Sequence, residues 1–155
     1  MAIGQSQATA PALASSKRRI STLVMAASAA VMIIAMFLPY VVSKSNSAIS
    51  VSVFGAMQGF EGLIPSSSKT LYTIIAASLG VAGLFAGLSL TGRKIWGVLS
   101  LIVSLLLLGF HALLLIGMNT ESRPATLGMG AWVIMLASAV LFGASIAFLA
   151  SKKRA

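Results

Sequence analysis

The sequence predicts an all-α integral membrane protein: a bundle of four transmembrane helices with a short β-like segment in its first outer loop. Three observations support this fold class. Of the 155 residues, 58% are hydrophobic and 8% are charged, whereas a soluble domain carries about 25% charged residues. Four long stretches are continuously apolar. Most Lys and Arg residues lie directly beside the ends of these stretches.

Each apolar stretch is long enough to cross a bilayer, because spanning the hydrocarbon core takes about 20 helical residues. No stretch contains Asp, Glu, Lys or Arg, and each such charge at mid-membrane costs about 2.5–3.5 kcal/mol. The strands of a transmembrane barrel would alternate in polarity instead. We predict a single transmembrane domain over residues 17–155, with spans at 20–42, 70–90, 95–118 and 129–150.

The basic residues predict the orientation. The positive-inside rule places the side with more Lys and Arg in the cytoplasm, so both termini are expected there and the loops 43–69 and 119–128 face outward. Residues 1–16 are small and polar, and are expected to form a disordered cytoplasmic tail. The cytoplasmic group is Lys17, Arg18, Arg19, Arg93, Lys94, Lys152, Lys153 and Arg154, and the outer group is Lys44, Lys69 and Arg123.

The first span also has features of a secretory signal peptide, since it follows a basic cluster. Its apolar run is longer than the core of about 7–15 residues that signal peptides use. We therefore expect a retained membrane anchor.

The first outer loop shows strand periodicity. Ile49, Val51 and Val53 alternate with two serines, which predicts a strand or small hairpin over the outer end of the bundle. Gly55 and the glycines after it are predicted turn positions. A mobile loop with chance alternation is the alternative.

Several chemistries are excluded or disfavoured by composition. The chain has no cysteine, so thiol catalysis, disulfides and thiolate metal sites are excluded. The net charge of +9 comes from clusters beside the spans and not from a basic surface interleaved with aromatics, so no nucleic-acid partner is expected. Glu61 and Glu121 are predicted to be solvated loop residues and not an acid–base pair. We expect no enzymatic activity, no cofactor and no metal site.

His111 is the only His, Asp, Glu, Lys or Arg side chain within the predicted spans. Burying such a group is costly, which makes it a candidate functional residue. A proton relay or metal site would need a second His or a carboxylate nearby, and the spans contain neither. We favour a neutral imidazole bonded to a serine hydroxyl or a carbonyl of a neighbouring helix.

Small residues at four-residue spacing form candidate packing faces. Such faces let two helices approach closely where lipid removes the hydrophobic driving force. We favour packing among the four helices of one chain, with docking of another subunit as the alternative. The third span carries large side chains on most faces and is expected to border lipid. The candidate packing residues are Gly80, Gly83 and Gly87 in the second span and Ala139, Gly143 and Ala147 in the fourth.

Aromatic residues lie near the predicted span ends. Trp96, Trp132, Tyr40 and Tyr72 are expected to form the interfacial belt that is typical of membrane proteins.

Two short motifs carry a resemblance. "MFLPY" ends the first span at residues 36–40, and "LGMGAW" at residues 127–132 begins the last. Together with the basic turn "TGRK", this layout resembles small four-span bacterial membrane proteins of unknown function. The resemblance implies a location in the bacterial cytoplasmic membrane. The outline is also similar to that of claudins, by analogy of architecture only.

The expected function is that of a non-catalytic membrane protein, serving as an accessory, assembly or stabilising subunit of a larger complex. Its expected partners are the lipid bilayer and other membrane-protein subunits, or further copies of itself. A small channel or transporter formed by several copies is the alternative, although such pathways need lining polar groups. An enzyme acting on lipid ranks last, for want of catalytic groups.

Overall fold

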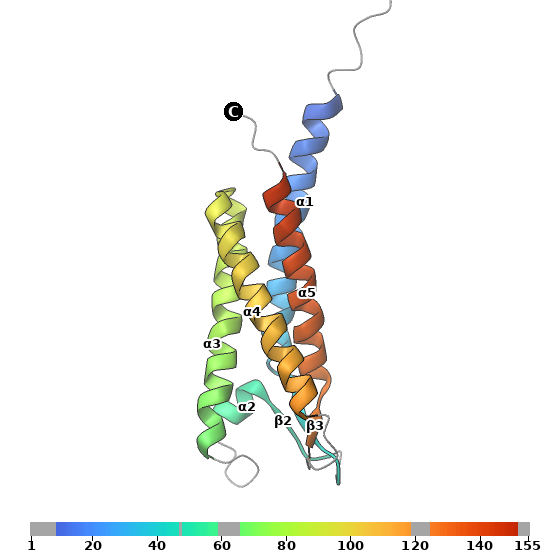
Figure 1. The fold of residues 1–155 in the computed structure, drawn as a ribbon, viewed down its shortest axis with the longest axis vertical. Coiled ribbons are helices and arrows are strands. Elements are labelled where there is room, and N and C mark those ends of the chain that lie inside the picture. The colour runs from blue at the N-terminus through green and yellow to red at the C-terminus, as the bar shows by residue number, and fades with distance from the viewer. Residues whose placement is uncertain (1–8, 47, 59–65, 119–124, 152–155) are drawn as a thin grey trace, which may run out of the picture.

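The computed structural model describes residues 9–46, 48–58, 66–118 and 125–151. This part of the chain is mostly helical and contains four helices long and apolar enough to cross a membrane. They run alongside one another for most of their length (Figure 1). The prediction of a helical, four-span bundle is thus confirmed at this level. The helices are α1 (Thr9–Ala35), α3 (Ser66–Leu88), α4 (Lys94–Met118) and α5 (Met129–Ala150).

Helix α1 differs from the predicted first span at both ends. It begins at Thr9. The prediction of a disordered tail is therefore wrong for residues 9–16, which are helical, and residues 1–8 lie outside the described part. The helix ends at Ala35, well before residue 42, because a residue that precedes proline is disfavoured in helical conformation and Pro39 follows. The last turn tightens through i→i−3 bonds, such as Leu38 N to Ala35 O at 3.1 Å, which occupy carbonyls at the helix end.

The other three spans lie close to their predicted positions. Helix α5 has the predicted bounds, α4 begins one residue earlier than predicted, and α3 ends in a 3₁₀ turn, η1 (Ser89–Thr91). Gly92 then adopts φ 73°, in the left-handed region that favours glycine. The Gly92 amide donates to Ser89 O at 2.9 Å. This cap allows the chain to reverse sharply into α4.

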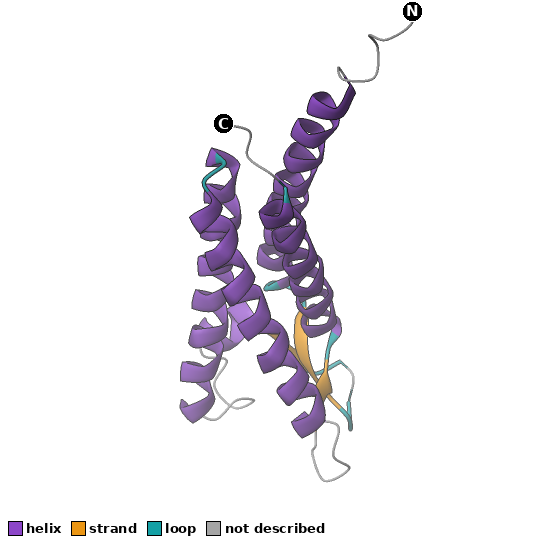
Figure 2. Ribbon diagram, turned by 45° about the horizontal axis from the view of Figure 1, so that its top comes forward, coloured by secondary structure: helices purple, strands orange, loops and turns teal. Residues whose placement is uncertain are grey.

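A three-stranded antiparallel sheet closes one end of the bundle. Strands β1 (Pro39–Ser43), β2 (Ser50–Ser52) and β3 (Ala125–Leu127) pair in the order β2-β1-β3. Figure 2 shows them at the end opposite to the start of α1 and the end of α5. The predicted strand near residues 49–53 is confirmed as β2. The sheet also contains two unpredicted strands, and it joins the segment after α1 to the segment before α5.

The predicted turn at Gly55 is wrong. The residues after β2 form a short helix, α2 (Val53–Gln58). Ser52 caps its start, since its hydroxyl accepts a hydrogen bond from the Gly55 amide at 3.0 Å. Gly59, Gly62, Glu61 and Glu121 lie outside the described residues.

The helices form a ring in which α1 packs on α5 and α3, and α4 packs on the same two helices. Fully buried apolar side chains from α1, α3 and α5 fill the centre. In contrast, α4 turns many large side chains outward, as predicted for a helix that borders lipid. The central residues include Met25, Met32, Leu79, Ile134 and Leu141.

Arg18 fastens the end of the bundle away from the sheet. Its guanidinium donates to the Gly92 carbonyl and lies 4.9 Å from the centre of the Phe148 ring, a cation–π contact. The Phe148 ring in turn packs against Gly97, where a Cβ would lie 2.7 Å from Cε1 of the ring. One arginine therefore links α1, the α3–α4 turn and α5.

Candidate functional site

The candidate site is a buried polar pair at the sheet end of the bundle. His111 on α4 is 1% exposed and Tyr40 on β1 is 2% exposed. The Tyr40 hydroxyl lies 3.1 Å from His111 Nε2, and His111 Nδ1 lies 2.8 Å from Leu107 O. A carbonyl can only accept, so Nδ1 carries the proton and Nε2 accepts from Tyr40. Both ring nitrogens are therefore occupied in a neutral imidazole.

Tyr40 is suited to the donor role. Burial raises the pKa of its phenol above the ordinary value, and the neighbouring Tyr72 raises the pKa further. The hydroxyl therefore stays protonated at neutral pH. The Tyr40 and Tyr72 rings meet edge to face at a centroid distance of 6.0 Å, as aromatic pairs prefer.

The site is held by three elements. His111 ends a seam of buried residues on α4 that alternates three- and four-residue steps, the spacing of one helix face. Tyr40 reaches the site because α1 stops before Pro39 and β1 then runs across the end of the bundle. Tyr72 comes from the first turns of α3. The α4 seam is Gly97, Ser100, Ser104, Leu107 and His111.

The sequence-based prediction for Tyr40 and Tyr72 is wrong. Tyr40 and Tyr72 were assigned to the interfacial belt, but both are buried. The imidazole is hydrogen-bonded as predicted, although its partners are a carbonyl of its own helix and a tyrosine hydroxyl. The sequence did contain a signal for the Tyr40–His111 contact. A buried imidazole needs a hydrogen-bond partner, and Tyr40 lies at the same end of its predicted span as His111.

The Tyr40–His111 pair is suited to a structural role. Within the described residues no group of three or more His, Cys, Asp or Glu side chains could hold a metal. Both His111 nitrogens are engaged by partners within the chain. The hydrogen bond instead ties β1 to α4, so it fixes the sheet onto the bundle.

The hydroxyls of the buried serines on α5 also form hydrogen bonds within the chain. Ser138 donates to Ile134 O at 2.7 Å, and Ser145 donates to Leu141 O at 2.8 Å, so each bonds to its own helix. Ser145 Oγ also lies 3.3 Å from Ser100 Oγ, across the contact between α4 and α5. In the described part of the chain no buried side-chain N or O atom lacks a partner.

The two motifs singled out in the sequence meet in one joint beside the site. The Gly128 amide donates to Tyr40 O at 2.8 Å. A Cβ at Gly128 would clash with the Pro39 carbonyl oxygen and lie 2.9 Å from the Pro39 carbonyl carbon. At Gly130 a Cβ would lie 2.9 Å from Leu38 O. The "MFLPY" and "LGMGAW" segments are thus two halves of the contact that seats α5 against the end of α1.

Comparisons of the chain with protein-family models, with curated proteins and with solved structures found no match.

Most of the small residues predicted to pack between the chain's own helices do not lie at a helix–helix contact. Ala139, Gly143 and Ala147 all lie exposed on the outside of α5, so the favoured interpretation, packing within the chain, is wrong for them. Gly80 is also exposed, and a Cβ at Gly80, Gly87 or Gly143 would meet nothing within 4 Å. Gly83 makes only an ordinary contact, with a Cβ position 3.4 Å from Ile33. Among the described glycines, the close approaches are made by Gly97, Gly128 and Gly130.

Proposed function

We propose that the chain is a non-catalytic protein of the bacterial cytoplasmic membrane, which serves as an accessory, assembly or stabilising subunit of a larger membrane complex. The observation that carries the proposal is the outward position of Ala139, Gly143 and Ala147 on α5. Small residues at this spacing let a second helix approach closely. Because the helices that the structure describes leave this face uncovered, it suits a helix of another subunit.

The few polar side chains in the interior also support a structural role. A pathway for ions or polar solutes needs polar groups that face it. His111 and the buried serines instead direct their hydrogen bonds to partners within the chain. A channel or transporter made of several copies is the second candidate, and it predicts solute flux in liposomes that contain the purified protein alone.

The first test is recovery of a partner. With an affinity tag after Ala155 and extraction in a mild detergent, we expect a larger membrane protein to co-purify in fixed ratio. The substitution Gly143→Leu should reduce its recovery at least about tenfold, which corresponds to about 1.4 kcal/mol of lost association. Ala112→Leu is the matched control, because Ala112 is exposed on α4. Equal recovery from both variants would contradict the assignment of this face.

The second test concerns orientation. Arg19, Arg93 and Lys94 are exposed at the end of the bundle that also holds the start of α1 and the end of α5 (Figure 1). By the positive-inside rule this end is cytoplasmic. A green fluorescent protein fused after Ala155 should therefore fluoresce, and alkaline phosphatase fused there should be inactive. An active phosphatase fusion would place both termini outside.

A further inference from the structure

Two exposed arginines at the end of the bundle away from the sheet are not explained by the proposed subunit role. Arg19 follows Arg18 on α1, and Arg93 follows Gly92 in the turn before α4. The Arg18 guanidinium donates to the Gly92 carbonyl, and these two residues are 74 positions apart in the sequence. This bond therefore holds Arg19 and Arg93 on neighbouring segments of the same end.

The positive charge of the two arginines is not neutralised within the described part of the chain. The described residues include no Asp or Glu, and no hydrogen bond or ion pair joins the Arg19 or Arg93 guanidinium to another of them. Arg18, in contrast, is engaged with Gly92 and the Phe148 ring. Exposed charges of one sign without a counter-charge attract a ligand of the opposite sign. The surface therefore suits an anion.

Exposed apolar side chains adjoin both arginines. Leu23 lies four residues after Arg19, on the same side of α1, and is 64% exposed. On either side of Arg93, Leu90 and Ile95 are 56% and 61% exposed. An acidic peptide would match the charge of this surface and leave its apolar part uncovered. A phospholipid with a negative headgroup matches both parts.

The arginines also lie at the depth of lipid headgroups. The membrane-crossing part of α1 begins at Ser16 and that of α4 at Lys94, so each arginine lies within about 5 Å of the start of such a segment. Basic residues at this depth attract anionic lipids of the nearer leaflet. Leu23 is only about 6 Å from Arg19 along α1, well inside the depth of about 15 Å of that leaflet. One lipid can therefore reach the charged and the apolar part together.

The position of Arg19 on α1 places it beside α3. Ile33 lies fourteen residues after Arg19, which is close to four full turns of the helix. The Ile33 Cδ1 atom lies 3.4 Å from the position that a Cβ would take at Gly83 on α3. Arg19 therefore lies on the side of α1 that meets α3, the helix that leads into the turn with Arg93.

The two neighbouring lysines lie on other sides of their helices. Lys17 is about 200° around α1 from Arg19. Lys94 is one turn before Gly97, which packs against Phe148 of α5. A guanidinium also offers phosphate two parallel N–H donors, whereas an ammonium acts as a point charge. Lys17 and Lys94 are exposed as well, so they provide a charge-matched control.

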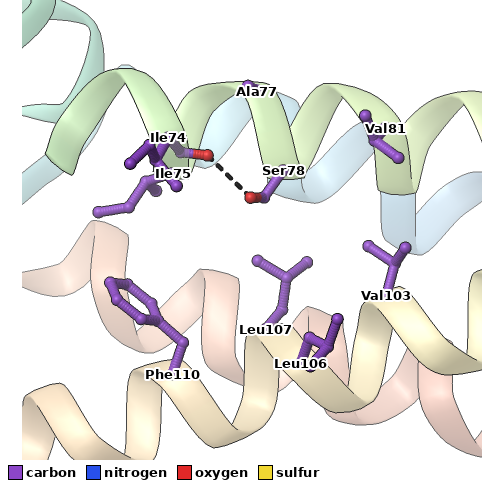
Figure 3. A pocket seen from close by; sticks show the side chains of 9 residues that line it. All are labelled: Ile74, Ile75, Ala77, Ser78, Val81, Val103, Leu106, Leu107 and Phe110. Atoms are coloured by element: carbon purple, nitrogen blue, oxygen red, sulfur yellow. Dashed lines mark hydrogen bonds between the residues drawn. The ribbon is translucent and has the colours of Figure 1, made fainter. Parts of the chain in front are cut away.

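An apolar groove between α3 and α4 is not part of this surface. Figure 3 shows the side chains that line it, and none of them is charged. One of them is Val81, and Gly83 lies two residues later, about 200° around α3. The groove and the contact with α1 are therefore on different sides of α3.

We propose that Arg19 and Arg93 bind the phosphate of one anionic phospholipid in the leaflet at this end of the bundle, with its acyl chains along the exposed side chains of Leu23 and Leu90. Arg18 is the positioning residue, because its bond to Gly92 holds the two arginines near each other. The proposal does not depend on the subunit role, since the small-residue face of α5 takes no part in it.

Fluorescence quenching by brominated lipids tests the proposal. In a background carrying Trp96→Phe and Trp132→Phe, Leu23→Trp places a reporter beside Arg19. Ile146→Trp places a control reporter on α5, where Ile146 is 47% exposed and lies about 6 Å from the end of the helix. The proteins are reconstituted in phosphatidylcholine vesicles. Phosphatidylglycerol or phosphatidylcholine, brominated in the upper half of the acyl chains, is then added as quencher.

We expect phosphatidylglycerol to quench the Leu23→Trp reporter with an apparent affinity at least about fivefold higher than that of phosphatidylcholine. Arg19→Gln with Arg93→Gln should reduce this ratio to about one and leave the ratio at the control reporter unchanged. Lys17→Gln with Lys94→Gln removes the same number of charges and should retain the preference at Leu23→Trp. All four residues are exposed, so neither pair of substitutions should affect folding.

Three outcomes would overturn the proposal. An equal loss of preference in the arginine and lysine pairs would mean that the total charge of this end attracts the lipid, without a site. Absence of quenching by either lipid at Leu23→Trp would mean that protein covers this surface. Loss of the preference when inorganic phosphate replaces chloride at constant ionic strength would make the arginines a site for a free anion.

Discussion

Replacing Gly128 by alanine is expected to lower the free energy of unfolding by about 2–3 kcal/mol, the upper part of the range for overpacked positions. The reason is space and not backbone conformation, since Gly128 has φ −86° and ψ −179°, which any residue can adopt. The added Cβ would clash with the carbonyl oxygen of Pro39, a backbone atom that cannot rotate away. The measurement is equilibrium unfolding in detergent, followed by the loss of helical circular dichroism.

Gly143→Ala is the matched control for this prediction. Gly143 lies within α5, the helix that Gly128 precedes, and a Cβ there meets nothing within 4 Å. Gly143→Ala should therefore not lower the free energy of unfolding, since alanine is the better helix former. The same loss of stability in both variants would mean that the contact between Gly128 and Pro39 does not seat α5.

His111→Ala is expected to cost about 3 kcal/mol, because it opens a cavity in a buried site and leaves the Tyr40 hydroxyl without its acceptor. Tyr40→Phe should cost about 1–2 kcal/mol, because it leaves His111 Nε2 unpaired. In the double variant the two costs should fall short of their sum by about 1 kcal/mol, the coupling expected of directly bonded residues. The same unfolding measurement on all four proteins completes the cycle.

Leu113→Ala controls for the effect of shortening a side chain on α4. Leu113 lies two residues beyond His111 and is 70% exposed, so it should change stability by no more than about 0.5 kcal/mol. Strictly additive effects of His111→Ala and Tyr40→Phe would show that the 3.1 Å contact is not a stabilising hydrogen bond.

The bounds of α4 and α5 were predictable because polarity changes abruptly there. Lys94 marks the start of α4, and Gly128 precedes α5. The end of α1 was not found, because residues 36–42 remain apolar after the helix has stopped. Hydropathy cannot distinguish such a turn and strand from a further helical turn, and Pro39 was the residue that decided between them.

The three-stranded sheet could be predicted only in part. The alternation around Val51 marks β2 on a local scale. In contrast, β3 has three residues, too few to show a period, and it pairs Thr126 with Val42 from a distant part of the chain. Such a pairing depends on how the helices bring the segment after α1 beside the segment before α5, and no local pattern encodes that.

The interior of the bundle was misjudged because the four-residue spacing of small residues was weighed by itself. On α5 the face with Gly143 points outward, while Ala144 and Ser145 beside it are buried. On α4 the inward face alternates three- and four-residue steps, as in Ser100, Ser104 and Leu107. In lipid, large apolar side chains lie as favourably outside as inside, so the small and polar residues of α4 mark its inner face.

The ring of helices places the first span of the chain beside the last, and this has a consequence for biogenesis. During synthesis α1 enters the membrane early, but its neighbour α5 is translated only after α3 and α4. Transmembrane helices are each stable in lipid before they associate, so α1 can pack on α3 first while the side that meets α5 stays uncovered. Its pairing with α5, and the contact of Gly128 with Pro39, can be completed only after α3, α4 and α5 have all been synthesised.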